Sequence, residues 1–141
     1  MKTGLPLILL VILSIFLYKE DGIFASSNYM PQDSELALLM RKIHADAKVM
    51  RSDLINEDRD LVYDPSIEFI LNASPTRPSV QGPDFEAFSK YYIQKTQELV
   101  ENGDEEDYNK MVESCIACHQ EFCPGPIKTI NKLRIRPSSA Q

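Results

Sequence analysis

Apolar residues recur in the central part of the chain at alternating spacings of four and three, the pattern of amphipathic helices. The first such stretch, from Ser34 to about Ile55, predicts a helix with a narrow apolar seam, as in helix bundles. Asp33 or Ser34 can cap its start. The seam residues are Leu36, Met40, Ile43, Ala47, Met50 and Leu54.

Two more helices are predicted on either side of a crossover. Residues 64–71 begin with an aspartate followed by a proline, which predicts a second, shorter helix. Residues 72–83 are rich in turn-forming residues and predict a linker. A third helix should begin near Pro83 and end at Gly103, a common C-cap. Its apolar face is made of Phe85, Phe88, Tyr92, Thr96 and Leu99.

A fourth helix is predicted from Asp104, because the acidic residues 105–107 complement the dipole of a helix start. We prefer this explanation of the acidic cluster to a docking site. The sequence Pro-Gly-Pro at 124–126 must break or bend the helix, and a short basic helix or turn follows over 127–133. No strand-like alternation is visible, so the predicted fold class is all-α. The inner face would be Tyr108, Met111, Val112, Cys115, Cys118 or His119, and Phe122.

The apolar run from Leu5 to Tyr18 differs from the helical patterns. Lys2 precedes it and small residues follow at 25–27, so it predicts a secretory signal peptide. The chain would then consist of a signal at 1–25 and one domain at 26–141, and the protein would be periplasmic or otherwise exported. The alternative is an uncleaved membrane anchor, although the run is shorter than the roughly 20 residues that span a bilayer.

Composition and charge bear on which partners and stabilising groups the protein can have. The chain has 141 residues, of which 43% are hydrophobic, and a formal net charge of −6. The acidic balance argues against a nucleic-acid partner, because phosphate binding needs a basic surface. A domain this small gains noticeably from a cross-link, a metal or a cofactor.

Residues 115–119 form the motif C-x-x-C-H, which is the attachment signature of c-type haem. Cys115 and Cys118 lie one helical turn apart and can form thioethers with the two vinyl groups of a porphyrin. His119 would supply the proximal imidazole to the iron. A thioredoxin-like site would need a βαβ context, a zinc site would need a second ligand pair, and a structural disulfide leaves the histidine unexplained.

With this motif close to the C-terminus, as CIACHQEF, behind an export signal and bundle-type helices, the chain resembles the class II c-type cytochromes, the cytochrome c-prime group. The resemblance implies an antiparallel four-helix bundle with one covalent haem on the C-terminal helix and His119 as proximal ligand. It also implies that the first helix covers the distal face of the haem. Homodimers are common in the family, so the resemblance implies a possible homodimer. The chain departs from the family in its short second helix and in residues 122–126, which replace a basic helix end.

The distal ligand is left open by the sequence. We favour Met40 as the sixth ligand, because a thioether in a dry core is a good soft ligand for iron. His44 and Met50 are alternatives, as is an open site. Met111 is expected on the proximal side. Cys123, the third cysteine, is expected to pack near the proximal histidine, with an intermolecular disulfide as the alternative.

These features predict an exported monohaem electron carrier that cycles between Fe(III) and Fe(II), exchanges electrons with redox partner proteins and is not an enzyme. The alternative is a protein that binds or senses nitric oxide or carbon monoxide at an open distal site. Such a site would be formed by Leu36, Leu39, Met40 and Ile43. Peroxidase activity is the third possibility, with His44 as the available distal histidine.

Overall fold

The computed structural model describes residues 32–136. The chain divides into two units between Gln32 and Asp33, and only the second is described here; the predicted signal peptide at 1–25 lies outside the described residues. The described elements are α2 (Glu35–Ile55), η1 (Pro65–Leu71), η2 (Pro78–Val80), α3 (Pro83–Asn102), α4 (Glu105–Phe122), α5 (Ile127–Ile130) and η3 (Asn131–Leu133). All are helices, which confirms the predicted all-α class. None of them is both long enough and apolar enough to cross a bilayer.

Helix α2 follows the predicted seam. The Ser34 hydroxyl caps it by accepting a hydrogen bond from the Ala37 N–H at 3.2 Å. Ile43, Ala47 and Leu54 are buried. The other three seam positions are partly buried and pack against the same core. The four-three spacing therefore identified the inward face of this helix correctly.

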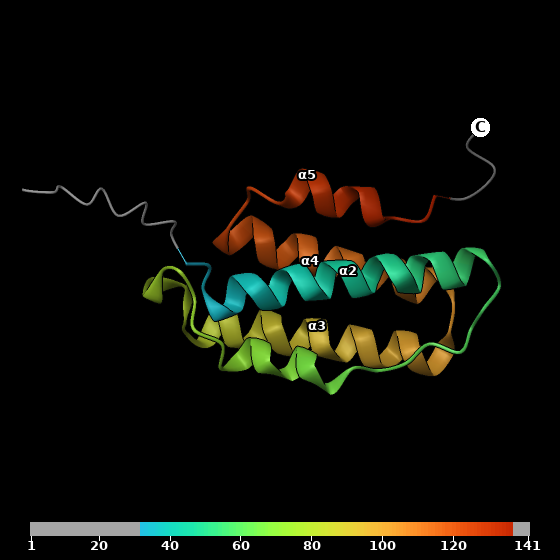
Figure 1. Ribbon diagram of the computed structural model, residues 1–141, viewed down its shortest axis with the longest axis horizontal. Helices are drawn as coiled ribbons and strands as arrows, with labels where there is room; N and C mark the ends of the chain where they lie inside the picture. Colours follow the sequence, from blue (N-terminus) through green and yellow to red (C-terminus); the bar gives the residue numbers. More distant parts are fainter. Residues whose placement is uncertain (1–31, 137–141) are drawn as a thin grey trace, which may run out of the picture. The chain divides into compact units, whose positions relative to one another are not determined.

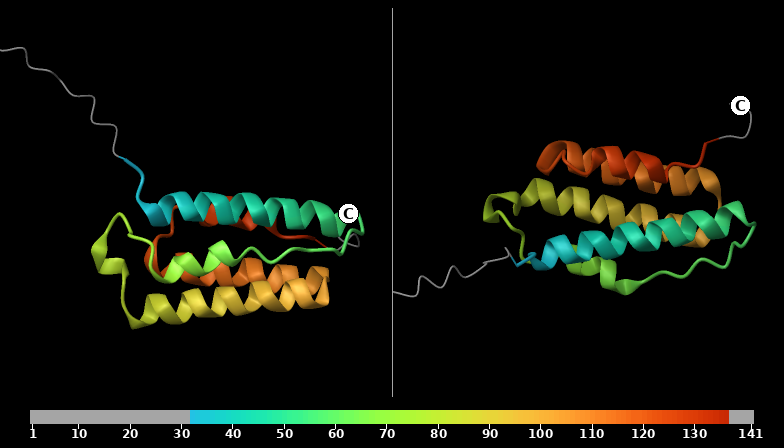
Figure 2. Two further views of the ribbon diagram at one scale, coloured as in Figure 1. Left: turned by 60° about the horizontal axis from the view of Figure 1, so that its bottom comes forward. Right: turned by 45° about the horizontal axis from the view of Figure 1, so that its top comes forward.

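The predicted second helix is present as the 3₁₀ helix η1, with Asp64 as its cap accepting from the Ser66 N–H at 2.8 Å. Before it, residues 56–64 run back along α2 without regular structure (Figures 1 and 2). The described part thus has three long helices, α2, α3 and α4, while η1 and the segment before it stand where a long second helix would be.

Helices α3 and α4 form a hairpin with a two-residue connection. Gly103 ends α3 in the left-handed region at φ 65°, where a side chain is disfavoured. A Cβ at this position would make only ordinary contact with Arg59 at 3.4 Å, so the requirement for glycine comes from the backbone conformation. Asp104 then caps α4 by accepting from the Asp107 N–H at 2.8 Å. Both predicted boundaries are confirmed.

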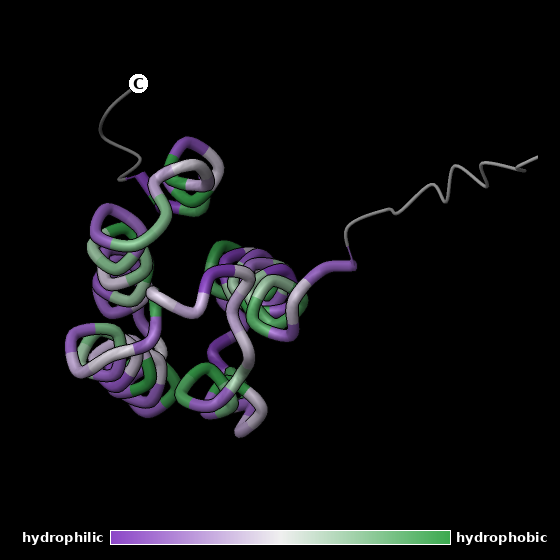
Figure 3. Tube along the Cα trace, turned by 90° about the vertical axis from the view of Figure 1, so that its left-hand side faces the viewer, coloured by the Kyte–Doolittle hydropathy of each residue, from purple (hydrophilic) through white to green (hydrophobic). Residues whose placement is uncertain are grey.

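The hairpin is antiparallel, and its register can be followed from end to end. The Phe85 and Phe122 rings meet edge to face, with centroids 5.5 Å apart, at the end far from the turn. Next to the turn, Leu99 and Tyr108 are both fully buried. Viewed along their axes, the helices surround a common interior (Figure 3).

The C-terminal segment packs on α4 (Figure 1). The Asn109 side chain bonds both the N–H and the carbonyl of Ile135 at 2.9 Å, and Arg134 forms an ion pair with Glu113 at 2.8 Å. Ile130 and Leu133 are buried against the core. The expected short basic helix is therefore confirmed, as α5 followed by η3.

We expect Tyr108→Phe to lower the free energy of unfolding by about 0.5–1.5 kcal/mol. The Tyr108 hydroxyl donates a buried hydrogen bond to the Ala47 carbonyl at 2.9 Å and so joins α4 to α2. Urea unfolding measures the change. Tyr91→Phe is the control, because Tyr91 is 47% exposed and its hydroxyl forms no hydrogen bond with described residues. Equal losses in the two variants would contradict this role.

We expect Asp64 to contribute to acid sensitivity. The Lys42 ammonium and the Ser66 N–H hold the pKa of Asp64 at about 2, below its ordinary value of 3.8. The charged form is therefore favoured by folding, and its contribution, present above about pH 4, is lost as the pH falls towards 2. Asp64→Asn should make the free energy of unfolding less dependent on pH between about 4 and 2, as measured by urea unfolding at each pH. Asp60→Asn is the control, since Asp60 forms no ion pair in residues 32–136.

Candidate functional site

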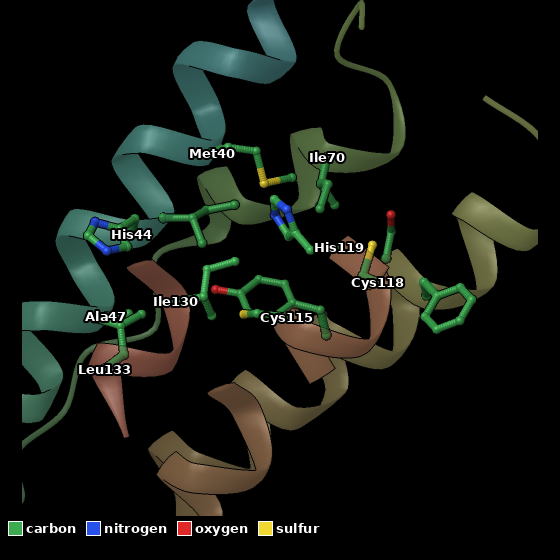
Figure 4. A pocket seen from close by; sticks show the side chains of 13 residues that line it. Met40, His44, Ala47, Ile70, Cys115, Cys118, His119, Ile130 and Leu133 are labelled. Carbon is green, nitrogen blue, oxygen red and sulfur yellow. The ribbon is translucent and has the colours of Figure 1, made fainter. Parts of the chain in front are cut away.

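The three residues of the C-x-x-C-H motif line a narrow, partly open cavity of about 50 Å³ in the helical unit. We call it the inner cavity (Figure 4). Apolar side chains from η1, α5 and η3 complete its wall. Its chemically distinctive lining residues are Cys115, Cys118 and His119 from α4, Met40 and His44 from α2, and Ser89 from α3.

A wider groove of about 670 Å³ continues from the inner cavity towards solvent. We call it the outer groove. It shares Met40 and His119 with the inner cavity and runs between the start of α2, the crossover and the end of α4. Arg41 and Arg77 line it, and no acidic side chain does so among the described residues. The described lining of the groove therefore carries no negative charge, although Arg41 is paired with Asp33 beside it.

His119 is oriented by Cys123. Its Nδ1 lies 3.1 Å from the Cys123 carbonyl and 3.4 Å from the Cys123 thiol, and the tautomer with its proton on Nδ1 donates to the carbonyl and leaves Nε2 free to bind a metal. Burial lowers the pKa of the imidazole, although the bond to Cys123 opposes this shift. The ring is therefore neutral near pH 7, and its Nε2 has no hydrogen-bond partner in the described part of the chain. A metal-binding histidine commonly donates its second nitrogen to a carbonyl in this way.

The end of α4 supplies that carbonyl. Residues before proline avoid the helical conformation, and Cys123, which precedes Pro124, is extended at φ −159° and ψ 81°. Its N–H still bonds the His119 carbonyl at 3.0 Å. The break that departs from the family pattern therefore orients the motif histidine. The sequence predicted Cys123 near His119 but missed the role of its backbone; the signal was the proline.

The two motif thiols are protonated and face apolar surroundings. Burial is the main cause that raises the pKa of Cys115 to about 12 and that of Cys118 to about 11. Cys115 is only half-buried as a residue, but its thiol points into the protein. Reactive redox cysteines have lowered pKa values. This environment therefore argues against a thioredoxin-like site.

The candidate distal ligands differ in whether they line the site. Met40 and His44 line both the inner cavity and the outer groove, whereas Met50 and Met111 line neither. In Figure 4 the Met40 side chain extends from α2 towards the side where His119 lies, and the His44 ring lies farther from His119. Of the residues expected around an open site, Ile43 lines the inner cavity and Leu36 the outer groove; Leu39 lines neither.

Sequence reasoning missed two residues of the site. Ser89 is fully buried in α3 and lines the inner cavity. Its signal was the spacing, because 85, 89, 92, 96 and 99 follow the four-three pattern. Arg77 in the crossover donates to the Phe122 carbonyl at 2.9 Å, and this contact links distant segments, so no local pattern marks it.

Comparisons of the chain with protein-family models, with curated proteins and with solved structures find no significant match. The resemblance to class II cytochromes therefore remains a prediction that depends on the motif and its place in the chain.

We expect native, haem-free protein to alkylate rapidly at a single thiol. Cys123 is exposed, whereas the Cys115 and Cys118 thiols are enclosed by the protein. Iodoacetamide labelling followed by mass spectrometry should give one fast adduct, and three after denaturation. Cys123→Ser should abolish the fast adduct. Rapid labelling of Cys115 in the native protein would contradict the burial of its thiol.

Proposed function

We propose that this protein is an exported monohaem c-type cytochrome that carries electrons. The observation that carries the proposal is the shared orientation of Cys115, Cys118 and His119 into one apolar cavity. Two neutral thiols and a neutral imidazole on a single helix turn are the donor set that covalent haem attachment requires.

The surroundings of the motif fit haem. The inner cavity itself holds only about 50 Å³, so a haem would also fill the adjoining outer groove of about 670 Å³; the lining of the inner cavity is mainly apolar, as in cofactor sites. The outer groove provides an opening for the polar edge of the group, and the guanidinium groups of Arg41 and Arg77 can pair with its carboxylates. Arg41 already bonds Asp33, which leaves Arg77 as the less committed of the two.

Attachment needs no oxidant. Cys115 and Cys118 would each add their S–H across one vinyl C=C, which forms a C–S bond and places the proton on the neighbouring carbon. The thiols must be reduced for this step, and the protonated state favoured by their burial provides the S–H.

Once bound, haem iron supplies one-electron chemistry between Fe(III) and Fe(II). The protein residues would do the rest: His119 offers Nε2 as the proximal ligand, and the Cys123 carbonyl fixes its ring. Met40 is the preferred sixth ligand because it lines the cavity from the helix opposite α4. Apolar side chains from η1 and α5 would keep water away.

A second candidate function is the binding of nitric oxide or carbon monoxide. It is favoured by the outer groove, which reaches both Met40 and His119 from the surface and could admit a small gas. The two functions differ in whether Met40 occupies the sixth position.

The first test is covalent haem itself. The chain is produced in a host that exports and attaches c-type haem, and is analysed by pyridine haemochrome spectra and by mass. We expect one haem through two thioethers. Cys115→Ala and Cys118→Ala should each show a single-thioether spectrum, whereas Cys123→Ala should keep both. Wild-type protein without covalent haem would contradict the proposal.

We expect Met40→Ala to convert a low-spin haem spectrum to a high-spin one, because the sixth ligand is lost. Met50→Ala is the matched control on the same helix: Met50 lines neither the cavity nor the groove, so its spectrum should be unchanged. Absorption spectra of the reduced proteins, with and without carbon monoxide, measure the difference. A high-spin wild type that binds carbon monoxide at once would instead support the gas-binding function.

A further inference from the structure

Ser89 is the one fully buried side chain of the cavity wall with an unused hydrogen-bonding group. It is 0% exposed, it lines the inner cavity, and its Oγ has no partner within the part of the chain that the structure describes. Leaving a buried hydroxyl without a partner is unfavourable. The hydroxyl therefore lacks an acceptor that a chemical change in the cavity wall, such as the attachment of an occupant, could provide.

Two other buried hydroxyls show that a helix can satisfy such a group itself. Ser114, 1% exposed in α4, bonds the Met111 carbonyl at 2.7 Å, and Thr96 in α3 bonds the Tyr92 carbonyl at 3.0 Å. This bond to the preceding turn is the usual solution for serine and threonine in helices. Ser89 does not use it.

The register of the hairpin shows which group faces Ser89. Phe85 packs on Phe122 at the end far from the turn, and Leu99 and Tyr108, which stand equally far from the turn, are both fully buried next to it. Counting inward from Phe85 and Phe122 by four residues on each helix places Ser89 of α3 at the level of Cys118 of α4. Both residues line the inner cavity.

We propose that Ser89 is a positioning residue for the Cys118 tether, and that its hydroxyl donates a hydrogen bond to the Cys118 sulfur once that sulfur is a thioether. This inference rests on the proposed haem attachment. A thiol carries its own proton, whereas a thioether sulfur can only accept, so attachment makes the two groups complementary. Hydrogen bonds to the sulfurs of iron–sulfur clusters shift their reduction potentials, and we expect a weaker effect of the same kind at a thioether on the porphyrin edge.

The expected effect on electron transfer has a definite sign. Donation to the sulfur withdraws electron density from the porphyrin edge and favours Fe(II). Removing the hydroxyl by Ser89→Ala should therefore make the haem harder to reduce, with about a two- to fivefold loss in the equilibrium constant for reduction, since hydrogen bonds to sulfur are weak. Ser114→Ala removes a buried serine hydroxyl that is already satisfied, and should leave the potential unchanged.

A double-mutant cycle identifies the acceptor. The reduction potential is measured by spectroelectrochemistry on the haem-loaded wild type, Ser89→Ala, Cys118→Ala and the double variant. Haem in the Cys118→Ala background stays tethered through Cys115, and there Ser89→Ala should have no effect. An unchanged potential in Ser89→Ala, or the same shift in both backgrounds, would overturn the inference.

Stability gives a second readout that needs no redox measurement. In the haem-free chain, Ser89→Ala should be neutral or stabilising, because it removes an unpaired buried hydroxyl; in the loaded protein it should be destabilising. Ser114→Ala should destabilise both forms. Equal effects of Ser89→Ala in both forms would mean a purely structural role. A wild type that carries no covalent haem is a separate result, and would contradict the proposed function first.

Discussion

The two-residue connection between α3 and α4 determines most of what the protein can do. Gly103 adopts a left-handed conformation and Asp104 caps the next helix at once, so the hairpin has no freedom to slide. The register that results brings Phe85 onto Phe122 and sets the α3 face against the motif. Because the motif occupies one turn of α4, a slip of a single position would turn both cysteines away from the cavity. The geometry of the candidate site therefore depends on a turn at the other end of the helix that carries the motif.

The other end of α4 is fixed by different contacts. The crossover is tied to the start of α2, where the Leu36 N–H bonds the Ser74 carbonyl at 3.1 Å and the Glu35 carboxylate accepts from the Ser74 N–H at 3.0 Å. Arg77 then joins the crossover to the last carbonyl of α4. These contacts hold α2 over the motif and frame the outer groove, so that Met40 lines the same space as His119.

Local patterns were enough to predict the helices, because periodicity and capping residues act within a few positions. The seam of α2, the boundaries of α3 and the cap of α4 were all predicted from such signals. The motif itself is local, so its three residues were identified from sequence. What could not be predicted depends on distant segments: the extended return of residues 56–64, the contact of Arg77 with α4 and the enclosure of the motif by α5. The 3₁₀ geometry of η1 was also missed, since a short apolar segment after a proline fits either type of helix.

The core gives a physical reason why a bound group would stabilise the fold. The sequence has no tryptophan, and its helices meet at the inner cavity without closing it. A group bound there would touch α2, η1, α3, α4 and α5 together, so its binding energy would add directly to the stability of the folded state. Tethering it through Cys115 and Cys118 would make that contribution independent of its concentration. The same covalent bonds that would retain a haem for electron transfer would thus also stabilise a small domain, whose own core contributes limited burial.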